Sequence, residues 1–139
     1  MLFRSGRVAP VAGVYERNAI VVVPSRGEGF GMVALEAAER GRAAIVSRVG
    51  GLPEIVADGE TGVVVPPEDA GALAAAIVAL ATDPGRVAAY GSAARARALG
   101  SFSEGAAADG VDAVYRHLAS RRSTTAAASS ASTKSNETR

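Results

Sequence analysis

Three short apolar runs divide the first half of the chain. Residues 19–25 (AIVVVPS) form a valine-rich run that stops at a proline, and Ala43–Ser47 (AAIVS) and residues 63–65 (VVV) form two more. Short continuous apolar runs are typical of strands that are buried on both faces, and such strands usually belong to a parallel sheet. We therefore expect three strands of one parallel sheet.

Segments rich in helix-forming residues lie between and after these runs. Gly41 is suited to end the first of them, and Glu68 or Asp69 is suited to cap a later one. Asp83 and Pro84 are typical of the cap and the first residue of a further helix. The predicted helices cover residues 32–40, a short turn at 53–57, Ala70–Ala81, a segment from Pro84 in which Arg95 and Arg97 form a solvated face, and residues 103–118.

Strands that alternate with helices at this spacing predict an open parallel α/β sheet with flanking helices, which is a Rossmann-like fold. Residues 1–120 are expected to form this domain, and Ser103 is expected to cap its last helix. From Ser123 onward the sequence (STTAAASSASTKSNETR) has almost no large apolar residue, so burial cannot offset the entropy of ordering it. Residues 121–139 are therefore predicted to be a disordered tail rich in Ser, Thr and Ala.

Charge and composition exclude some classes of protein. The chain has a formal charge of +1, but the residues after Ser120 carry a net +3, which leaves −2 for the rest. A mildly acidic body with few aromatic residues argues against a nucleic-acid-binding protein, which normally shows a basic face. There are no cysteines, so disulfides and thiolate metal sites are excluded.

The sequence also bears on location. No segment has the apolar length of a signal peptide core or of a bilayer span, so a cytoplasmic protein is expected. Arg121 and Arg122 would contribute only about 1 kcal/mol each near an anionic membrane, so we expect membrane association to be peripheral at most.

The strongest candidate for chemistry is the loop RGEGFG, which follows the first predicted strand. In an open parallel sheet, ligands bind outside the carboxyl ends of the strands. Gly27, Gly29 and Gly31 allow positive φ and close backbone approach, and the free amides of the following helix offer an anion site. Glu36 lies roughly 7.5 Å along that helix and could accept hydrogen bonds from vicinal hydroxyls of a ligand whose phosphate or diphosphate is held at the amides. Glu28 would face the other side of the diphosphate.

A purely structural interpretation of the same residues stays open at this level. Glycine-rich turns between strand and helix are common, and a glutamate near a helix N-terminus can simply stabilise the macrodipole. The loop also matches neither of two better-known phosphate signatures, because GxxxxGK[ST] is absent and GEGFGM lacks the third glycine of GxGxxG.

A longer set of motifs resolves this choice. The run VVVPSRGEGFGMVALEAAERGRAAIVSRVGGLPEIVADGETGVVVPPED contains Pro-Ser after a strand, Glu28 and Glu36 seven residues apart with EGFG between them, GGLPEIV, and DGETGVVVPPED, with FS at residues 102–103. In this order the motifs resemble the donor-binding half of the retaining family 4 glycosyltransferases, and the resemblance covers about residues 6–118. It implies retaining transfer of a hexosyl group from a nucleotide-diphosphate sugar to an acceptor.

The resemblance also assigns roles to individual residues. It implies that Glu28 is catalytic and lies near the donor sugar, that Glu36 binds the ribose hydroxyls, and that Leu35 touches the diphosphate through its backbone. The amides that would contact sugar hydroxyls or phosphate belong to Gly29, Phe30 and Gly31, and the glycines that would shape the pocket are Gly50 and Gly51. Members of the family need no bound metal and no cofactor beyond the donor, and this chain has no Asp-x-Asp motif.

The chain also departs from the family pattern. Members of the family have two Rossmann-like domains, with the acceptor-binding one first, whereas this sequence corresponds to part of the second. We therefore expect a truncated donor domain whose acceptor domain is supplied by another chain or was lost. The alternative is a noncatalytic nucleotide-sugar-binding or interaction module, or an inactive gene fragment; the spacing of EGFG and ALE argues against a nucleotide-sugar epimerase. The sequence does not choose among UDP, GDP and ADP.

Overall fold

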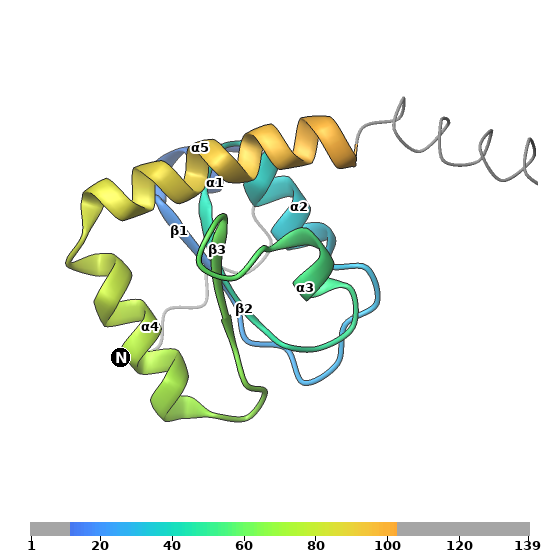
Figure 1. Cartoon of the computed structure of the whole chain (residues 1–139), viewed down its shortest axis with the longest axis vertical. Helices are drawn as coiled ribbons and strands as arrows, with labels where there is room; N and C mark the ends of the chain where they lie inside the picture. The colour runs from blue at the N-terminus through green and yellow to red at the C-terminus, as the bar shows by residue number, and fades with distance from the viewer. Residues whose placement is uncertain (1–11, 103–139) are drawn as a thin grey trace, which may run out of the picture. The chain divides into compact units, whose positions relative to one another are not determined.

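The computed structural model describes residues 12–102, which are drawn as ribbons in Figure 1. The chain divides into two units between Gly100 and Ser101, and the architecture below is that of the first unit. The predicted helix at 103–118, the predicted domain end at residue 120 and the predicted tail at 121–139 lie outside the described residues.

A parallel sheet of three strands forms the centre of this unit. The strands are β1 (Ile20–Val23), β2 (Ala43–Ser47) and β3 (Gly62–Val65), and they lie side by side in the order β1-β2-β3. The register places Ile45 opposite Val22 on one side and opposite Val63 on the other. All five residues of β2 are buried, as the apolar run predicts for a central strand. The predicted open parallel α/β sheet is therefore confirmed.

The helices agree with the predicted ones except at the N-terminal side. Within residues 12–102 the helices are α1 (Ala12–Arg17), α2 (Met32–Glu39), α3 (Leu52–Ile55), α4 (Ala70–Ala81) and α5 (Pro84–Ser101). The sequence did not predict α1. Gly41 follows α2 with a φ of 66°, as expected of a residue that ends a helix. Of the two candidate caps for α4, Asp69 is the one that acts, since its Oδ1 accepts a hydrogen bond from the Ala72 amide at 2.8 Å.

Helices cover both faces of the sheet (Figure 1). Helix α4 packs against β2 and β3, where Ile45, Val65, Ala76 and Leu80 form a buried cluster. Helix α2 packs against β1 and β2, and α3 packs against β2 beside α2. This arrangement leaves the carboxyl edge of the strands as the place where three loops meet.

Within residues 12–102 no single helix is both long and apolar enough to span a bilayer. Helices α4 and α5 meet these criteria only when they are counted together, and the chain bends by 101° between them.

Candidate functional site at the carboxyl edge of the sheet

Three connections leave the carboxyl ends of the parallel strands at the same edge of the sheet. They are residues 24–31 after β1, residues 48–51 after β2 and residues 66–69 after β3. Because this edge is where open α/β sheets bind ligands, we describe each connection in turn. All of the site residues predicted from the sequence belong to the first two connections and to α2.

Gly31 is fixed by two independent constraints. Its φ is 93°, a left-handed conformation that L side chains rarely adopt, and it is the residue directly before α2. A Cβ at this position would lie 2.7 Å from Cδ2 of Leu52 on α3. The glycine therefore lets the start of α2 lie directly against α3.

Gly50 and Gly51 lie against the backbone of the loop that contains Glu28. The Gly51 amide donates a hydrogen bond to the Gly29 carbonyl at 2.9 Å, and a Cβ on Gly51 would lie 2.8 Å from the Phe30 carbonyl oxygen. A Cβ on Gly50 would overlap the Glu28 carbonyl oxygen. The structure thus brings both glycines into contact with residues 28–30, so that the turn after β2 sets where this loop runs.

Gly27 and Gly29 differ from Gly31 because neither uses the positive φ that a glycine allows, although the Gly29 carbonyl does lie close to Gly51, whose amide donates to it at 2.9 Å. Neither has a left-handed φ, and no atom beyond the chain neighbours lies within 4 Å of the place a Cβ would take. The three glycines of the loop are therefore not equivalent. Only Gly31 is required by the local geometry.

Of the first four amides of α2, two have a hydrogen-bond acceptor within the chain and two have none among the described residues. The amides of Ala34 and Leu35 donate to the Gly31 carbonyl at 2.9 and 3.1 Å, so the Leu35 amide is already used within the helix. Among the described residues no acceptor is present for the amides of Met32 and Val33. The sequence analysis predicted an anion site at the first amides of this helix, and the structure identifies the amides without an acceptor as those of Met32 and Val33.

Glu28 lies on the loop and is half-buried. Its Oε2 accepts a hydrogen bond from the Ser25 hydroxyl at 3.3 Å, within the same connection. This contact orients the carboxylate through one oxygen and leaves Oε1 without a donor in the described part of the chain. Glu28 is therefore placed by the loop itself.

Glu36 lies in the second turn of α2 and is oriented from a different element. Its Oε2 accepts a hydrogen bond from the Tyr15 hydroxyl of α1 at 3.1 Å. The Arg40 guanidinium stacks over the Tyr15 ring, 5.0 Å from its centroid, and donates to the Glu36 carbonyl at 3.0 Å. Burial raises the pKa of Tyr15, and the hydrogen bond to Glu36 and the charge of that carboxylate raise it further, whereas the charge of Arg40 lowers it.

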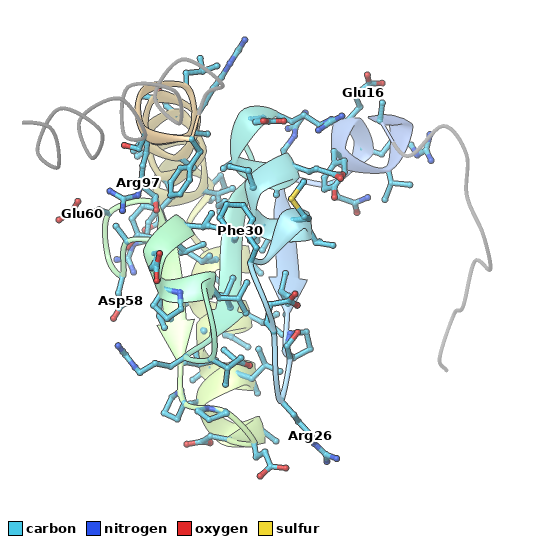
Figure 2. All side chains as sticks on the ribbon, turned by 90° about the vertical axis from the view of Figure 1, so that its right-hand side faces the viewer. Glu16, Arg26, Phe30, Asp58, Glu60 and Arg97 are labelled. Atoms are coloured by element: carbon cyan, nitrogen blue, oxygen red, sulfur yellow. The ribbon has the colours of Figure 1, made fainter. Side chains whose placement is uncertain are left out.

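Arg97 was expected on a solvated face of its helix, but it makes a specific contact. Its guanidinium Nη2 donates to the Glu54 carbonyl at 2.8 Å and so ties α5 to α3 (Arg97 is labelled in Figure 2). Arg95 and Arg97 are both exposed, as expected, and the hydrogen bond shows that an exposed arginine can also satisfy a carbonyl of a neighbouring helix.

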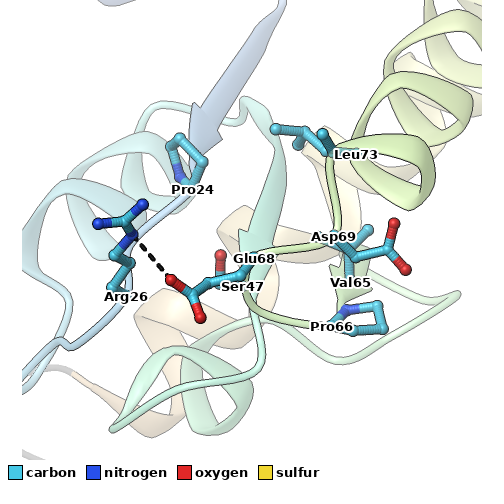
Figure 3. Close-up of a pocket in the computed structure, with 9 residues that line it drawn as sticks. Pro24, Arg26, Ser47, Val65, Pro66, Glu68, Asp69 and Leu73 are labelled. Carbon is cyan, nitrogen blue, oxygen red and sulfur yellow. Dashed lines mark ion pairs between the residues drawn. The ribbon is translucent and has the colours of Figure 1, made fainter.

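A cavity of about 290 Å³ lies at the same edge, on the α4 side (Figure 3). Its lining includes Pro24, Arg26, Ser47, Pro66, Glu68 and Leu73. Arg26 forms an ion pair with Glu68 at 3.0 Å, and Asp69 also lines the space. A diphosphate would meet two carboxylates here and one cation that is already paired, so this cavity is a poorer anion site than the start of α2.

The described residues contain no group of three His, Cys, Asp or Glu side chains that could hold a metal ion. The arrangement at α2 is therefore one of backbone amides flanked by two carboxylates. Amides at a helix N-terminus hold anions, and carboxylates accept hydrogen bonds from hydroxyls, so a ligand that carries both a phosphate and hydroxyl groups matches this site.

Residues 3–83 match the family of glycosyl transferases group 1. The chain belongs to this family. The matched segment contains every site residue predicted from the sequence, from Glu28 to Gly51. The prediction of a glycosyltransferase is confirmed at the level of this family.

Two curated relatives share more than 40% of the aligned residues with this chain. The D-inositol 3-phosphate glycosyltransferase of Segniliparus rotundus is 44% identical over 108 residues, which are 78% of this chain and 24% of the relative. The glycogen synthase of Mycobacterium tuberculosis is 42% identical over 106 residues, which are 76% of this chain and 25% of the relative. The chain therefore spans about a quarter of the length of these glycosyltransferases.

Solved structures of glycosyltransferases have the same fold. The sucrose-phosphate synthase of Thermosynechococcus elongatus is 40% identical, with a TM-score of 0.70 over 80% of this chain and 28% of that one. HepE from Anabaena, solved in complex with UDP, is 25% identical, with a TM-score of 0.66 over 84% of this chain and 30% of that one. The Rossmann-like assignment is confirmed by both.

Proposed function

We propose that this chain forms the donor site of a retaining glycosyltransferase of the family 4 type, which binds a nucleotide-diphosphate sugar for transfer of a hexosyl group. The observation that carries the proposal is the start of α2, where the amides of Met32 and Val33 have no acceptor among the described residues. Such amides favour a diphosphate, because they direct partial positive charge at the ligand without the cost of dehydrating a cation.

The two carboxylates would bind the other parts of the donor, the ribose and the sugar. Glu36 follows the free amides by one turn and would accept hydrogen bonds from the ribose hydroxyls next to a diphosphate held there. Glu28 precedes the amides on the loop and would lie at the sugar on the other side of the diphosphate. The structure of HepE with UDP supports a nucleotide at this fold in the family.

The same amides would act in the chemical step. When the bond between the sugar and the diphosphate breaks, negative charge grows on the diphosphate oxygens. Donors that are fixed in place before the reaction stabilise this charge without reorganising, which is the kind of electrostatic effect that dominates many enzymes. Glu28 would contact the sugar on which positive charge develops. Retention would be seen by NMR as the same anomeric configuration in donor and product.

Transfer also needs a site for the acceptor. The matched segment covers about a quarter of the length of the relatives, which are therefore about three times as long as this chain. We propose that the acceptor is bound by a domain that these residues do not contain, supplied by another segment or another chain. The donor base, UDP, GDP or ADP, and the acceptor stay open.

Calorimetric titration of the 139-residue chain with UDP-, GDP- and ADP-sugars tests the proposal. We expect saturable binding of one nucleotide, and loss of the Glu36 carboxylate in Glu36→Ala should weaken it about tenfold to a hundredfold, as for hydrogen bonds to a charged group. Glu39→Ala is the matched control, because Glu39 is an exposed glutamate on the same helix.

Two outcomes would contradict the proposal. One is the absence of saturable binding to all three donors by a chain shown to be folded by circular dichroism. The other is equal affinity in Glu36→Ala and Glu39→Ala, since the carboxylate at 36 would then have no contact with the ligand. Binding without any transfer, even with an acceptor domain added, would favour the noncatalytic nucleotide-sugar-binding module.

A further inference from the structure

Tyr15 is the side chain that orients the candidate ribose ligand, although it lies 21 residues away in the sequence. It belongs to α1, which Figure 2 shows beside α2 and which the Glu16 label marks. The Tyr15 side chain is only 6% exposed, and its hydroxyl donates to Oε2 of Glu36 at 3.1 Å. A buried phenol needs such a partner, because water cannot replace it.

Arg40 fixes the tyrosine from the other side. The guanidinium lies over the Tyr15 ring at 5.0 Å from the centroid, a cation–π contact, and its Nη1 donates to the Glu36 carbonyl at 3.0 Å. Tyr15, Glu36 and Arg40 therefore form a closed set of three contacts. Arg40 contacts the backbone of Glu36, so among the described residues it is the Tyr15 hydroxyl that restrains the carboxylate itself.

The set restrains one oxygen of the carboxylate and leaves the other available. Oε2 of Glu36 is occupied by Tyr15, whereas no donor to Oε1 is present in the described part of the chain. The Glu36 side chain is half-buried, so it is reachable from solvent. A carboxylate fixed in this way presents one acceptor in one direction, and a ligand hydroxyl that meets it does not have to order the side chain first.

We propose that Tyr15 is a positioning residue for ribose recognition, in that its hydroxyl fixes the Glu36 carboxylate so that the free oxygen faces the ribose hydroxyls of the donor. This inference rests on the proposed function, since it takes Glu36 as the ribose ligand. It adds a residue outside the loop and α2 to the donor site.

A simpler role for the same hydrogen bond is to hold α1 against α2. The two roles differ in the ligand atoms that they affect. A positioning role acts only through the ribose hydroxyls, so it disappears when the ligand lacks them. A role in attachment of α1 changes the site for every nucleotide alike.

The test is a comparison of UDP with 2′,3′-dideoxy-UDP by calorimetric titration, on the wild-type chain and on Tyr15→Phe. GDP or ADP with the matching dideoxy form is used if the wild type selects another base. The substitution removes one hydroxyl and keeps the ring, its burial and the contact with Arg40. We expect Tyr15→Phe to weaken UDP binding by about threefold to tenfold, the effect of one hydrogen bond, and to leave dideoxy-UDP binding unchanged.

Two further variants complete the test. Tyr90→Phe is the matched control, because Tyr90 is a partly buried tyrosine that packs on the α4 side of the sheet, and it should change neither affinity. Arg40→Gln removes the cation over the Tyr15 ring. We expect it to lower the affinity for UDP, as Tyr15→Phe does, and to leave the affinity for dideoxy-UDP unchanged. This variant provides an independent readout if Tyr15→Phe proves unstable.

Three outcomes would overturn the inference. The first is an equal loss of affinity for UDP and dideoxy-UDP in Tyr15→Phe, which indicates attachment of α1. The second is tighter UDP binding by this variant, which indicates that Tyr15 competes with the ligand. The third is unchanged UDP binding. All three presuppose that the wild type binds UDP and that Glu36→Ala binds it more weakly, so they reject the role of Tyr15 alone. A wild type that binds no nucleotide rejects the proposed function itself.

Discussion

Helices α2 and α4 both begin at the carboxyl edge of the same sheet, but their first turns are satisfied differently. At α4 the Asp69 side chain accepts from the Ala72 amide at 2.8 Å, and its carbonyl accepts from Leu73 at 3.1 Å. At α2 the corresponding residue is Gly31, which has no side chain to act as a cap. Both helices leave the amides of their first two residues without an acceptor among the described residues. They differ in that the Asp69 carboxylate already lies at the start of α4, whereas the cap residue of α2 brings no side chain there.

The residues that lead into the two helices also differ in strain. Gly31 takes a left-handed φ of 93° directly before α2, where glycine adopts it without cost. Before α4 the left-handed residue is Glu68, with a φ of 59°. The chain thus uses glycine where the backbone must approach Leu52, and it tolerates a strained glutamate where a cavity leaves room.

The largest effect is expected from Gly31→Ala. The substitution adds left-handed strain and a Cβ only 2.7 Å from Leu52, so we expect the free energy of unfolding to fall by about 2–4 kcal/mol. Urea unfolding followed by circular dichroism measures it. Gly27→Ala is the control and should change stability by less than about 0.5 kcal/mol. Similar losses in both variants would show that the two glycines are equivalent after all.

A smaller effect is expected from Asp69→Ala, which removes the cap of α4. The loss should be about 1 kcal/mol of unfolding free energy, as for other N-caps, with no change in nucleotide affinity. Thermal or urea unfolding gives the first value and calorimetric titration the second. Glu60→Ala, at an exposed turn residue, serves as the control. A clear loss of nucleotide affinity in Asp69→Ala would mean that the ligand lies at α4 and that the contrast between the two helices is misplaced.

The smallest effect is expected from Glu68→Gly, and it has the opposite sign. Relief of about 1–2 kcal/mol of left-handed strain, offset by about 0.5–1 kcal/mol of added chain entropy, should stabilise the fold by about 0.5–1 kcal/mol. Glu68→Ala keeps the strain and loses only the exposed ion pair with Arg26, so it should lower stability slightly. If Glu68→Gly and Glu68→Ala gave the same unfolding curve, Glu68 would not be strained.

Local signals account for the parts of the fold that the sequence predicted. The valine-rich runs determine β1, β2 and β3 because a buried strand needs continuous apolar side chains, and Pro24 and Pro66 end two of them because proline cannot donate to the ladder. Asp69 and Asp83 have cap chemistry that acts within three residues. These signals do not depend on the tertiary structure.

The features that the sequence did not predict depend on contacts between distant segments. Helix α1 has six residues, too few for a periodic pattern, and Tyr15 meets Glu36 only after folding. The sequence also gave equal weight to three glycines of the loop, because the contact that singles out Gly31 comes from Leu52 on α3. The placement of Glu28, Glu36 and the other site residues at a ligand stays a prediction until the titrations are made.

Gly50 and Gly51 also bear on how this site can change over evolution or in the laboratory. The loop around Glu28 and the turn after β2 touch through main-chain atoms, so any side chain at Gly50 or Gly51 would displace the loop. If both segments were randomised and variants were selected for use of a nucleotide-sugar donor, these two positions would tolerate the fewest amino acids. Neither glycine has a side chain that could contact a ligand. Substitutions that change the donor preference would then accumulate in the loop, whereas the turn would keep its two glycines.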